Sequence, residues 1–192
     1  LYEYFFHKKG LMTYPASDIG VFFKTNNLAK TPNAQIHFAP GAGEYNKSGA
    51  MKPSSGITAS VCNLRPKSRG YLELASSDPF DAPKIYANYL DEITDLQWMV
   101  EGVNKVREIF QTAPMQELEA QESKPGIKFT EKADLEEFIR EEALSVYHPI
   151  GTCKMGEGDE CVVDANLKVK GIIGLRVADA SIFPSIISGN TN

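Results

Sequence analysis

The 192-residue sequence predicts an α+β fold in which a mostly antiparallel β-sheet is flanked by helices. Two observations predict this class. Several short segments rich in β-branched or aromatic residues, bounded by Asn, Pro and Gly, follow one another before any long helical segment begins. Two amphipathic helical segments then occur in the second half, so the chain does not repeat strand–helix–strand units. We therefore expect antiparallel pairing rather than a parallel sheet.

The first half of the chain is expected to hold most of the strands. An aromatic cluster in residues 1–6 and the following His7-Lys8-Lys9-Gly10 are typical of a helix that ends on a glycine cap. Within residues 35–38, polar and apolar residues alternate, which places His37 on the face of Gln35, at the solvent or at the rim of a pocket. The predicted strands are residues 19–25, 35–39, 57–64, 70–75 and 84–87.

Residues 41–56 contain four glycines, Pro53 and few apolar side chains. Such a segment buries little surface to offset the entropy of ordering, so we expect a mobile loop. Two interpretations remain open for it, a lid over a binding site and a surface insertion of no functional consequence.

Helical spacing of apolar residues dominates residues 94–112, where Thr94 and Gln97 match a capping box. A second helix is predicted over residues 131–143, with Thr130 as its N-cap and a charged face toward solvent. Beyond it, alternation in residues 167–170 and the apolar residues 175–178 predict two further short strands.

Composition excludes several classes of function. The 20 basic and 25 acidic residues are mixed along the chain, with a net charge of −5 and 42% hydrophobic residues, so no basic stripe points to nucleic acid. The longest apolar run is too short for a transmembrane segment. Three cysteines without Cys-x-x-Cys or His-x-x-x-His spacing predict no metal site, and their low, odd number favours a reducing compartment. A small, roughly neutral partner is expected.

His148 is the candidate for chemistry. It precedes Pro149, which favours an extended backbone at the histidine, and Gly151 allows another backbone or a flat ligand to approach closely. An imidazole held in this way can exchange a proton near neutral pH. The alternative is a histidine that simply ends a strand.

The wider pattern resembles a known family. His-Pro-x-Gly-Thr-x-x-Met-Gly in residues 148–156, Val-Val-Asp in 162–164, Gly-Leu-Arg-Val-Ala-Asp-Ala-Ser in 174–181 and Ser-Gly-Asn-Thr-Asn in 188–192 resemble the C-terminal part of the glucose–methanol–choline (GMC) oxidoreductases. These are FAD-dependent alcohol oxidases and dehydrogenases. The resemblance implies that His148 is the catalytic base and that Asn190 is the second polar residue over the flavin. It also implies that four further residues contact FAD, namely Asp179, Ala180, Thr191 and Asn192.

The resemblance further implies how the chain is divided. Residues 1–170 are expected to form the substrate-binding domain, and residues 171–192 a segment that returns to an FAD-binding domain. The Gly-x-Gly-x-x-Gly fingerprint for the ADP half of FAD does not occur in the sequence. Members of the family continue beyond the residue that matches Asn192, so we expect a C-terminal fragment that does not retain FAD by itself.

The expected activity is that of a choline dehydrogenase-like enzyme, which oxidises a small-molecule alcohol and passes electrons to oxygen or a quinone-type acceptor. Two other classes stay open. A hydroxynitrile lyase would keep the same fold and FAD without net redox chemistry, and a non-catalytic binding module would keep only the fold.

Overall fold

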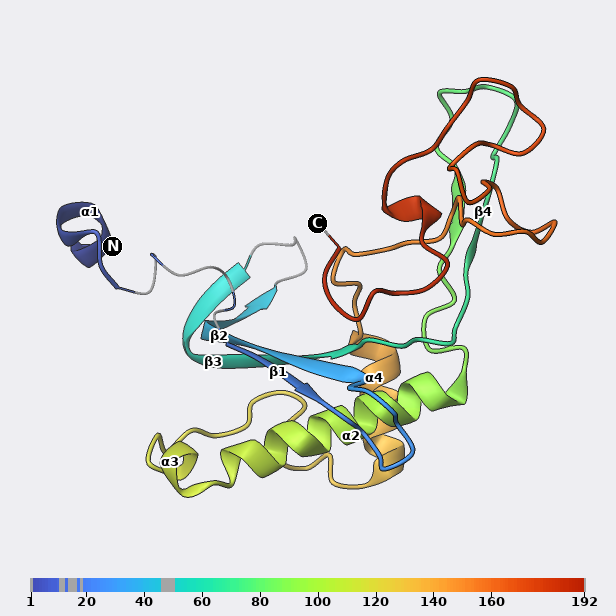
Figure 1. Cartoon of the computed structure of the whole chain (residues 1–192). Helices are drawn as coiled ribbons and strands as arrows, with labels where there is room; N and C mark the ends of the chain where they lie inside the picture. Colours follow the sequence, from blue (N-terminus) through green and yellow to red (C-terminus); the bar gives the residue numbers. More distant parts are fainter. Residues whose placement is uncertain (1, 11–12, 14–16, 18, 46–50, 192) are drawn as a thin grey trace. The chain divides into compact units, whose positions relative to one another are not determined.

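A computed structural model describes residues 2–10, 13, 17, 19–45 and 51–191 of the chain. It confirms the α+β class, with two antiparallel sheets and helices (Figure 1). The larger sheet has the order β1-β2-β3, formed by β1 (Ile19–Phe23), β2 (Ala34–Tyr45) and β3 (Met51–Asn63). The smaller pairs β4 (Tyr71–Glu73) with β5 (Lys84–Tyr86).

The chain forms two compact units, Leu1–Asn63 with Trp98–Glu136, and Leu64–Gln97 with Glu137–Asn192. Each unit therefore combines segments that are distant in the sequence. The predicted division into residues 1–170 and 171–192 assigns the second segment to a neighbouring FAD-binding domain. The compact units of this chain do not test that assignment, so it stays a prediction.

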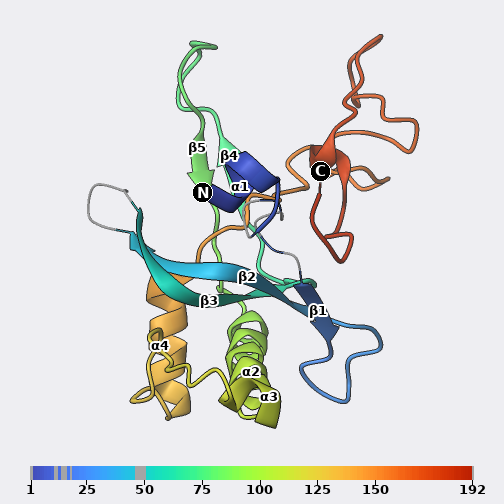
Figure 2. The ribbon, with the colours of Figure 1, turned by 90° about the vertical axis from the view of Figure 1, so that its left-hand side faces the viewer.

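One face of the larger sheet carries the core of the first unit. Ile36 on β2 is fully buried and pairs with Val61 on β3. Figure 2 shows helix α2 (Ile93–Phe110) on one side of this sheet, and Figure 1 shows it lengthwise. A Cβ added to Gly102 of α2 would lie 2.3 Å from Cγ1 of Val61 on β3. Only a glycine therefore allows the helix to pack this close to the strand. The aromatic rings of Phe38 on β2 and Phe110 on α2 make a second contact between the sheet and the helix, with centroids 6.2 Å apart.

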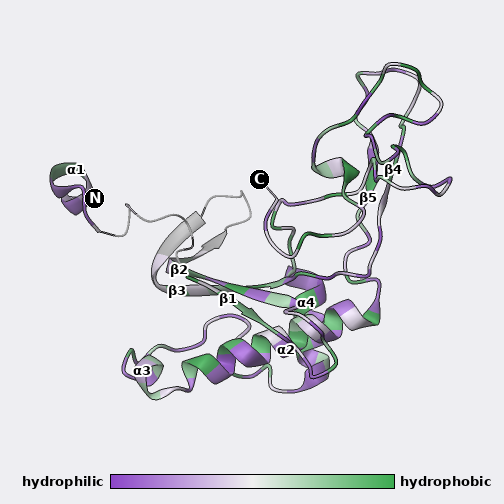
Figure 3. Ribbon diagram, in the orientation of Figure 1, coloured by the Kyte–Doolittle hydropathy of each residue, from purple (hydrophilic) through white to green (hydrophobic). Residues whose placement is uncertain are grey.

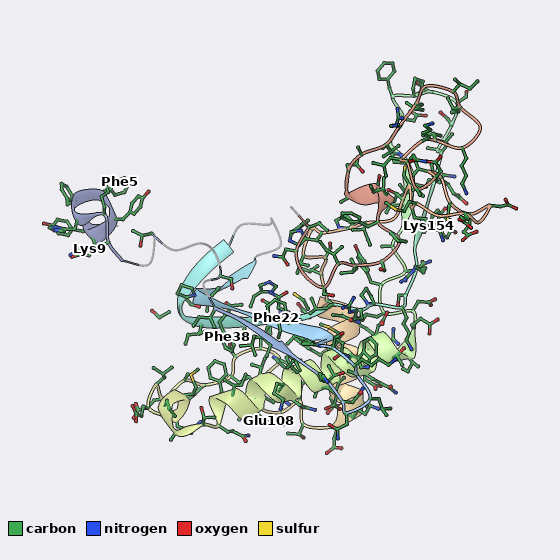
Figure 4. All side chains as sticks on the ribbon, in the orientation of Figure 1. Phe5, Lys9, Phe22, Phe38, Glu108 and Lys154 are labelled. Carbon is green, nitrogen blue, oxygen red and sulfur yellow. The ribbon has the colours of Figure 1, made fainter. Side chains whose placement is uncertain are left out.

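Strand alternation places Gln35, His37 and Cys62 on the opposite face of the sheet from Ile36 and Val61. The predicted grouping of His37 with Gln35 is therefore confirmed. His37 is half-buried, and its Nδ1 lies 3.4 Å from Sγ of Cys62. Figure 4 labels Phe22 and Phe38 on the neighbouring strands β1 and β2.

The prediction of a mobile loop over residues 41–56 was wrong for most of that range. β2 continues to Tyr45 and β3 begins at Met51, and the two strands pair up to Tyr45↔Met51 across a bulge between Pro40 and Ala42. Cross-strand hydrogen bonds order this hairpin without requiring buried side chains, which is why a count of apolar residues misjudged it. The tip, residues 46–50, lies outside the described residues, so the structure does not test the lid interpretation for that part.

The predicted N-terminal helix is confirmed as α1 (Tyr2–His7), which carries Phe5, and Figure 4 labels both Phe5 and Lys9, a residue just beyond the helix end. It is followed directly by Lys8 in the left-handed conformation, at φ 52°, ahead of the expected Gly10. A short helix that the sequence did not indicate, α3 (Ala113–Gln116), follows α2.

The segment after α3 is held by Arg107, whose guanidinium donates through Nη2 to Oε1 and through Nε to Oε2 of Glu122, at 2.8 and 2.9 Å, and to the carbonyl of Phe129.

Both long helices are confirmed with corrected starts. α2 begins at Ile93, so Thr94 lies inside the helix and is not its N-cap, and α4 (Lys132–Glu142) begins two residues after Thr130. Figure 3 shows α2 with hydrophobic and hydrophilic sides. The residues that the helices bury include Leu96, Val100, Leu135 and Ile139.

The last fifty residues contain little regular structure. The predicted strands at 167–170 and 175–178 are single bridges, Val163↔Val169 and Lys168↔Arg176, and not continuous strands. The short 3₁₀ helix η2 (Ala180–Ile182) lies in the red C-terminal segment of Figure 1. Within the described residues, no helix is both long and apolar enough to cross a membrane.

Candidate active site

His148 lies in an irregular segment whose backbone is held in an uncommon conformation. Tyr147, the preceding residue, has φ 61°, a left-handed value that costs a residue with a Cβ about 1–2 kcal/mol. The hydroxyl of Ser145 accepts a hydrogen bond from the Tyr147 N–H, at 3.0 Å, and supports this turn. Strain of this kind is found where a side chain must be aimed, and here it immediately precedes His148.

The segment after His148 is attached to η2 by backbone hydrogen bonds. The N–H of Cys153 donates to the carbonyl of Ser181 at 3.0 Å, and that of Met155 donates to the carbonyl of Ile182 at 2.8 Å. Gly151 has φ 85°, and a Cβ there would lie 3.3 Å from the carbonyl oxygen of Phe183. The close approach predicted at this glycine is therefore an approach of one backbone to another.

The His148 ring is half-buried and is oriented by the C-terminal segment. Its Nδ1 lies 3.3 Å from Oγ1 of Thr191, a residue 43 positions away in the sequence. Thus the structure brings together two residues that the sequence pattern could only place in separate motifs.

A cavity of 420 Å³ adjoins this contact, because Thr191 is also one of its lining residues. Asp179 and Ala180 line it as well, which places three of the four predicted cofactor-binding residues around one space. The remaining lining residues are apolar, and the sequence did not single them out: Leu167, Ala178, Ile182, Phe183 and Ile187. No sequence signal distinguished Ile182 and Phe183, because such apolar residues are equally typical of an ordinary core.

Asp179 has a structural task in addition to its place at the cavity. Its carboxylate caps η2, accepting a hydrogen bond from the Ser181 N–H at 2.8 Å and another from the Ser181 hydroxyl. These hydrogen bonds hold the pKa of Asp179 below its ordinary value, so the group is ionised at neutral pH. The anion therefore remains at the edge of the cavity.

Three predicted site residues are not part of this cavity lining, and the first is His148, which reaches it only through its contact with Thr191. Asn190 is exposed and is not among the cavity residues, and Asn192 lies outside the described residues. Within the part of the chain that the structure describes, no group of three or more His, Cys, Asp or Glu side chains is arranged to hold a metal ion.

The chemistry of the cavity fits part of a flavin. Ligand sites are typically apolar, with a few polar groups that fix orientation, and a flat ring system with polar edges matches apolar walls beside Asp179 and Thr191. Its volume of 420 Å³ lies within the usual range for small-molecule sites, which is about 300–1,000 Å³.

Comparison with known proteins decides the family. A family model described as GMC oxidoreductase matches residues 66–192, which is more than half of the chain. The chain belongs to the GMC oxidoreductase family. The resemblance expected from the motifs around His148 and Asn190 is thereby confirmed.

Relatives within the GMC oxidoreductases match this chain over its whole length. An alcohol dehydrogenase [acceptor] of Pseudomonas putida is 39% identical over 194 residues, covering 100% of this chain and 35% of the relative. Oxygen-dependent choline dehydrogenase 1 of Chromohalobacter salexigens is 40% identical over 192 residues, covering 99% of this chain and 34% of the relative. The chain thus spans about a third of the length of the curated relatives that it matches.

Two solved structures share the fold of this chain. Pyridoxine 4-oxidase from Mesorbium loti superposes with a TM-score of 0.77 at 24% identity, over 91% of this chain and 35% of that one. Formate oxidase of Aspergillus oryzae RIB40, studied for its FAD modification, gives 0.75 at 29% identity, over 84% of this chain and 29% of that one.

Proposed function

We propose that this chain supplies the catalytic base and part of the flavin site of an FAD-dependent oxidoreductase that acts on a small-molecule alcohol. The observation that carries the proposal is the contact between His148 and Thr191, since Thr191 also lines the cavity beside Asp179 and Ala180. It connects a candidate proton acceptor to a space whose lining fits part of a flavin. Membership of the GMC family and the choline and alcohol dehydrogenases among the relatives support the same activity.

Each residue has a distinct part in this proposal. When bound, FAD supplies the acceptor for the hydride that leaves the carbinol carbon. The His148 imidazole takes the hydroxyl proton, for which its free nitrogen must come within about 3 Å of the substrate oxygen. The Asn190 amide, which has both donor and acceptor groups, holds that oxygen.

The cavity residues hold the cofactor in this proposal. Its apolar side chains pack against the flavin, and Asp179, Ala180 and Thr191 orient a polar edge of it, with Asn192 as a fourth contact carried over from the family pattern. Residues 171–192 then form the segment that returns to an FAD-binding domain. Oxygen or a quinone-type compound is the proposed final electron acceptor.

The test measures flavin reduction in the full-length enzyme, mixed anaerobically with alcohols. His148→Ala should lower the limiting rate of reduction about 10²–10⁴-fold, the usual effect of removing a general base. Asn190→Ala should cost less, about one hydrogen bond or roughly 1–3 kcal/mol, because the proton acceptor is still present. His7→Ala, at an exposed histidine of α1, is the matched control and should react like the unmutated enzyme.

Three results would contradict the proposal. A His148→Ala enzyme that is still fast and retains FAD would show that His148 is structural. A bound flavin that no alcohol reduces, together with cyanohydrin cleavage, would point to the lyase. A full-length protein that binds no flavin would point to a binding module.

A further inference from the structure

The hydroxyl of Thr191 contacts Nδ1 of His148, and this contact leaves only the other ring nitrogen open to a substrate. Oγ1 of Thr191 lies 3.3 Å from Nδ1. Among the residues that the structure describes, Thr191 is the one hydrogen-bond partner of this imidazole. The ring nitrogen left for proton transfer is therefore Nε2.

The tautomer of His148 decides whether Nε2 can act. A neutral imidazole carries one proton, and the nitrogen without it is the acceptor. If the proton were on Nε2, that nitrogen would have no lone pair and could not take a proton from an alcohol. A hydrogen bond at one ring nitrogen sets which tautomer is present. The Thr191 hydroxyl can either accept from Nδ1–H or donate to an unprotonated Nδ1, and only the first arrangement leaves Nε2 free to take a proton.

We propose that Thr191 is a positioning residue whose hydroxyl oxygen accepts a hydrogen bond from Nδ1–H of His148 and so keeps Nε2 unprotonated. The inference rests on the proposed function, in which His148 is the base. When the alcohol proton moves to Nε2, the ring becomes an imidazolium and Nδ1–H still donates to the same oxygen. The contact therefore persists and strengthens as positive charge develops on the ring.

Backbone conformation on both sides of the contact supports a built arrangement. Tyr147 precedes His148 at φ 61°, and Ser188, three residues before Thr191, has φ 69°. Both are left-handed values in residues with a Cβ, a conformation that is retained only where the surroundings require it. Each strained position lies in one of the two segments that bring the hydroxyl to the imidazole.

The position of Thr191 also links the base to the cofactor site. The residue lines the cavity with Asp179 and Ala180 while its hydroxyl contacts His148. One residue thus fixes the location of the proton acceptor relative to the space proposed for the flavin.

Two substitutions separate the hydroxyl from the methyl group of Thr191. Thr191→Val keeps the shape and removes the hydroxyl, whereas Thr191→Ser keeps the hydroxyl and removes the methyl. In the full-length holoenzyme, the Val variant should lower the limiting rate of flavin reduction by an alcohol about tenfold, the effect of one hydrogen bond. The Ser variant should stay within about twofold of the unmutated enzyme. Because Thr191 also lines the cavity proposed for the flavin, the rates are compared on enzyme of equal flavin content, measured by the ratio of flavin to protein absorbance.

The opposite order, with Val fast and Ser slow, would show that Thr191 acts by packing and would overturn the proposal. Equal losses in both variants would overturn it too. These results are distinct from failure of the proposed function, because that failure requires His148→Ala to stay fast. A slow His148→Ala enzyme with a fast Thr191→Val enzyme rejects only the positioning role.

The tautomer gives a readout that does not depend on the Thr191 variants. The ¹⁵N chemical shifts of His148, assigned by their loss in His148→Gln, distinguish a protonated from an unprotonated ring nitrogen. In the unmutated holoenzyme, at a pH where the ring is neutral, Nδ1 should give the protonated signal. An unprotonated Nδ1 would overturn the proposal whatever the kinetics show.

Discussion

Oδ2 of Asp95 accepts hydrogen bonds from both the backbone N–H and the hydroxyl of Ser68, at 2.8 and 2.6 Å. The N–H of Lys67 donates to both oxygens of the same carboxylate. Asp95 is 2% exposed and lies in the first turn of α2. A carboxylate buried in this way joins the start of the helix to residues 67–68, because an ion removed from water requires several donors.

Replacing this carboxylate should be costly. Asp95→Asn removes the charge and turns an amide N–H toward donors, so we expect the free energy of unfolding to fall by about 3 kcal/mol. The measurement is a urea titration followed by circular dichroism. Asp159→Asn, at an exposed aspartate, is the control and should change the value by less than about 0.5 kcal/mol. A loss below about 1 kcal/mol at Asp95 would show that these hydrogen bonds matter little to stability.

The same contact shows what a local reading of the sequence misses. A capping box at Thr94 and Gln97 was expected, because Thr-x-x-Gln is a common helix start. The start of α2 instead involves Ser68, whose hydroxyl accepts a hydrogen bond from the Glu92 N–H at 3.1 Å while donating to Asp95. A partner some 25 residues away replaces a local cap, and no pattern within four residues reveals it.

Strands and helices with strong hydrophobic periodicity were predictable from the sequence, whereas the paired residues 41–45 and 51–56 of the β2–β3 hairpin were not. The alternation of apolar residues around Ile36 and their helical spacing around Val100 both indicate which side chains are buried, and both residues are buried in the structure. Residues 41–45 and 51–56 are ordered by backbone pairing between β2 and β3, and their glycines led to the wrong prediction of a mobile loop. Pairing between backbones leaves little trace in side-chain type.

At the site, the motifs predicted which residues matter and left their arrangement open. His148, Asp179 and Ala180 were found because their residue types match a family pattern. The hydrogen-bond partner of the histidine could not be found in that way, since Thr191 is 43 residues distant and was expected only to contact the cofactor. The sequence analysis did not predict the apolar wall of the cavity, because Ile182 and Phe183 are residue types that also fill ordinary cores.

Gly102 should not tolerate a methyl group while Val61 is present. A Cβ would lie 2.3 Å from Cγ1 of Val61, so Gly102→Ala should destabilise the fold by about 1–2 kcal/mol although alanine favours helix. A double-mutant cycle measured by urea unfolding tests the cause. In a Val61→Ala background the same substitution should become nearly neutral, because both Cγ atoms are gone and only the Cβ of residue 61, at 3.3 Å, remains close. Equal costs in both backgrounds would contradict the steric explanation, and Glu101→Ala at an exposed neighbouring position is the control.

Gln35 is a buried amide whose acceptor is not satisfied. The side chain is 8% exposed, and its Oε1 has no hydrogen-bond partner among the described residues. An unsatisfied buried polar group costs about 1–3 kcal/mol, so Gln35→Met, which keeps the length of the side chain, should leave the unfolding free energy unchanged or raise it by up to about 2 kcal/mol. Thermal and urea unfolding of the full-length protein measure this, with the exposed Gln111→Met as control. A clear loss of stability would mean that Oε1 has a partner in the full-length protein.

Cys62 should be a slow thiol with a specific effect on alkaline stability. Burial raises its pKa above the ordinary value, so the reactive thiolate is scarce in the folded protein. Labelling by iodoacetamide at pH 8, followed by peptide mass spectrometry, should be much slower at Cys62 in the native protein than at the same cysteine in urea. Rapid native labelling would show that this strand face opens easily.

The sign of the pH effect follows from the direction of the pKa shift. A group whose pKa is higher in the folded than in the unfolded state stabilises the fold fully below the unfolded pKa, which is about 8.5 for cysteine, and this contribution is lost as the pH rises through the folded pKa. The unfolding free energy should therefore fall between about pH 8 and pH 10. Cys62→Ala removes the ionising group and should show a smaller fall over the same range, even if its stability at pH 7 is lower. Parallel curves for the two proteins would mean that other groups control alkaline unfolding, and that the Cys62 thiol ionises as readily in the folded as in the unfolded chain.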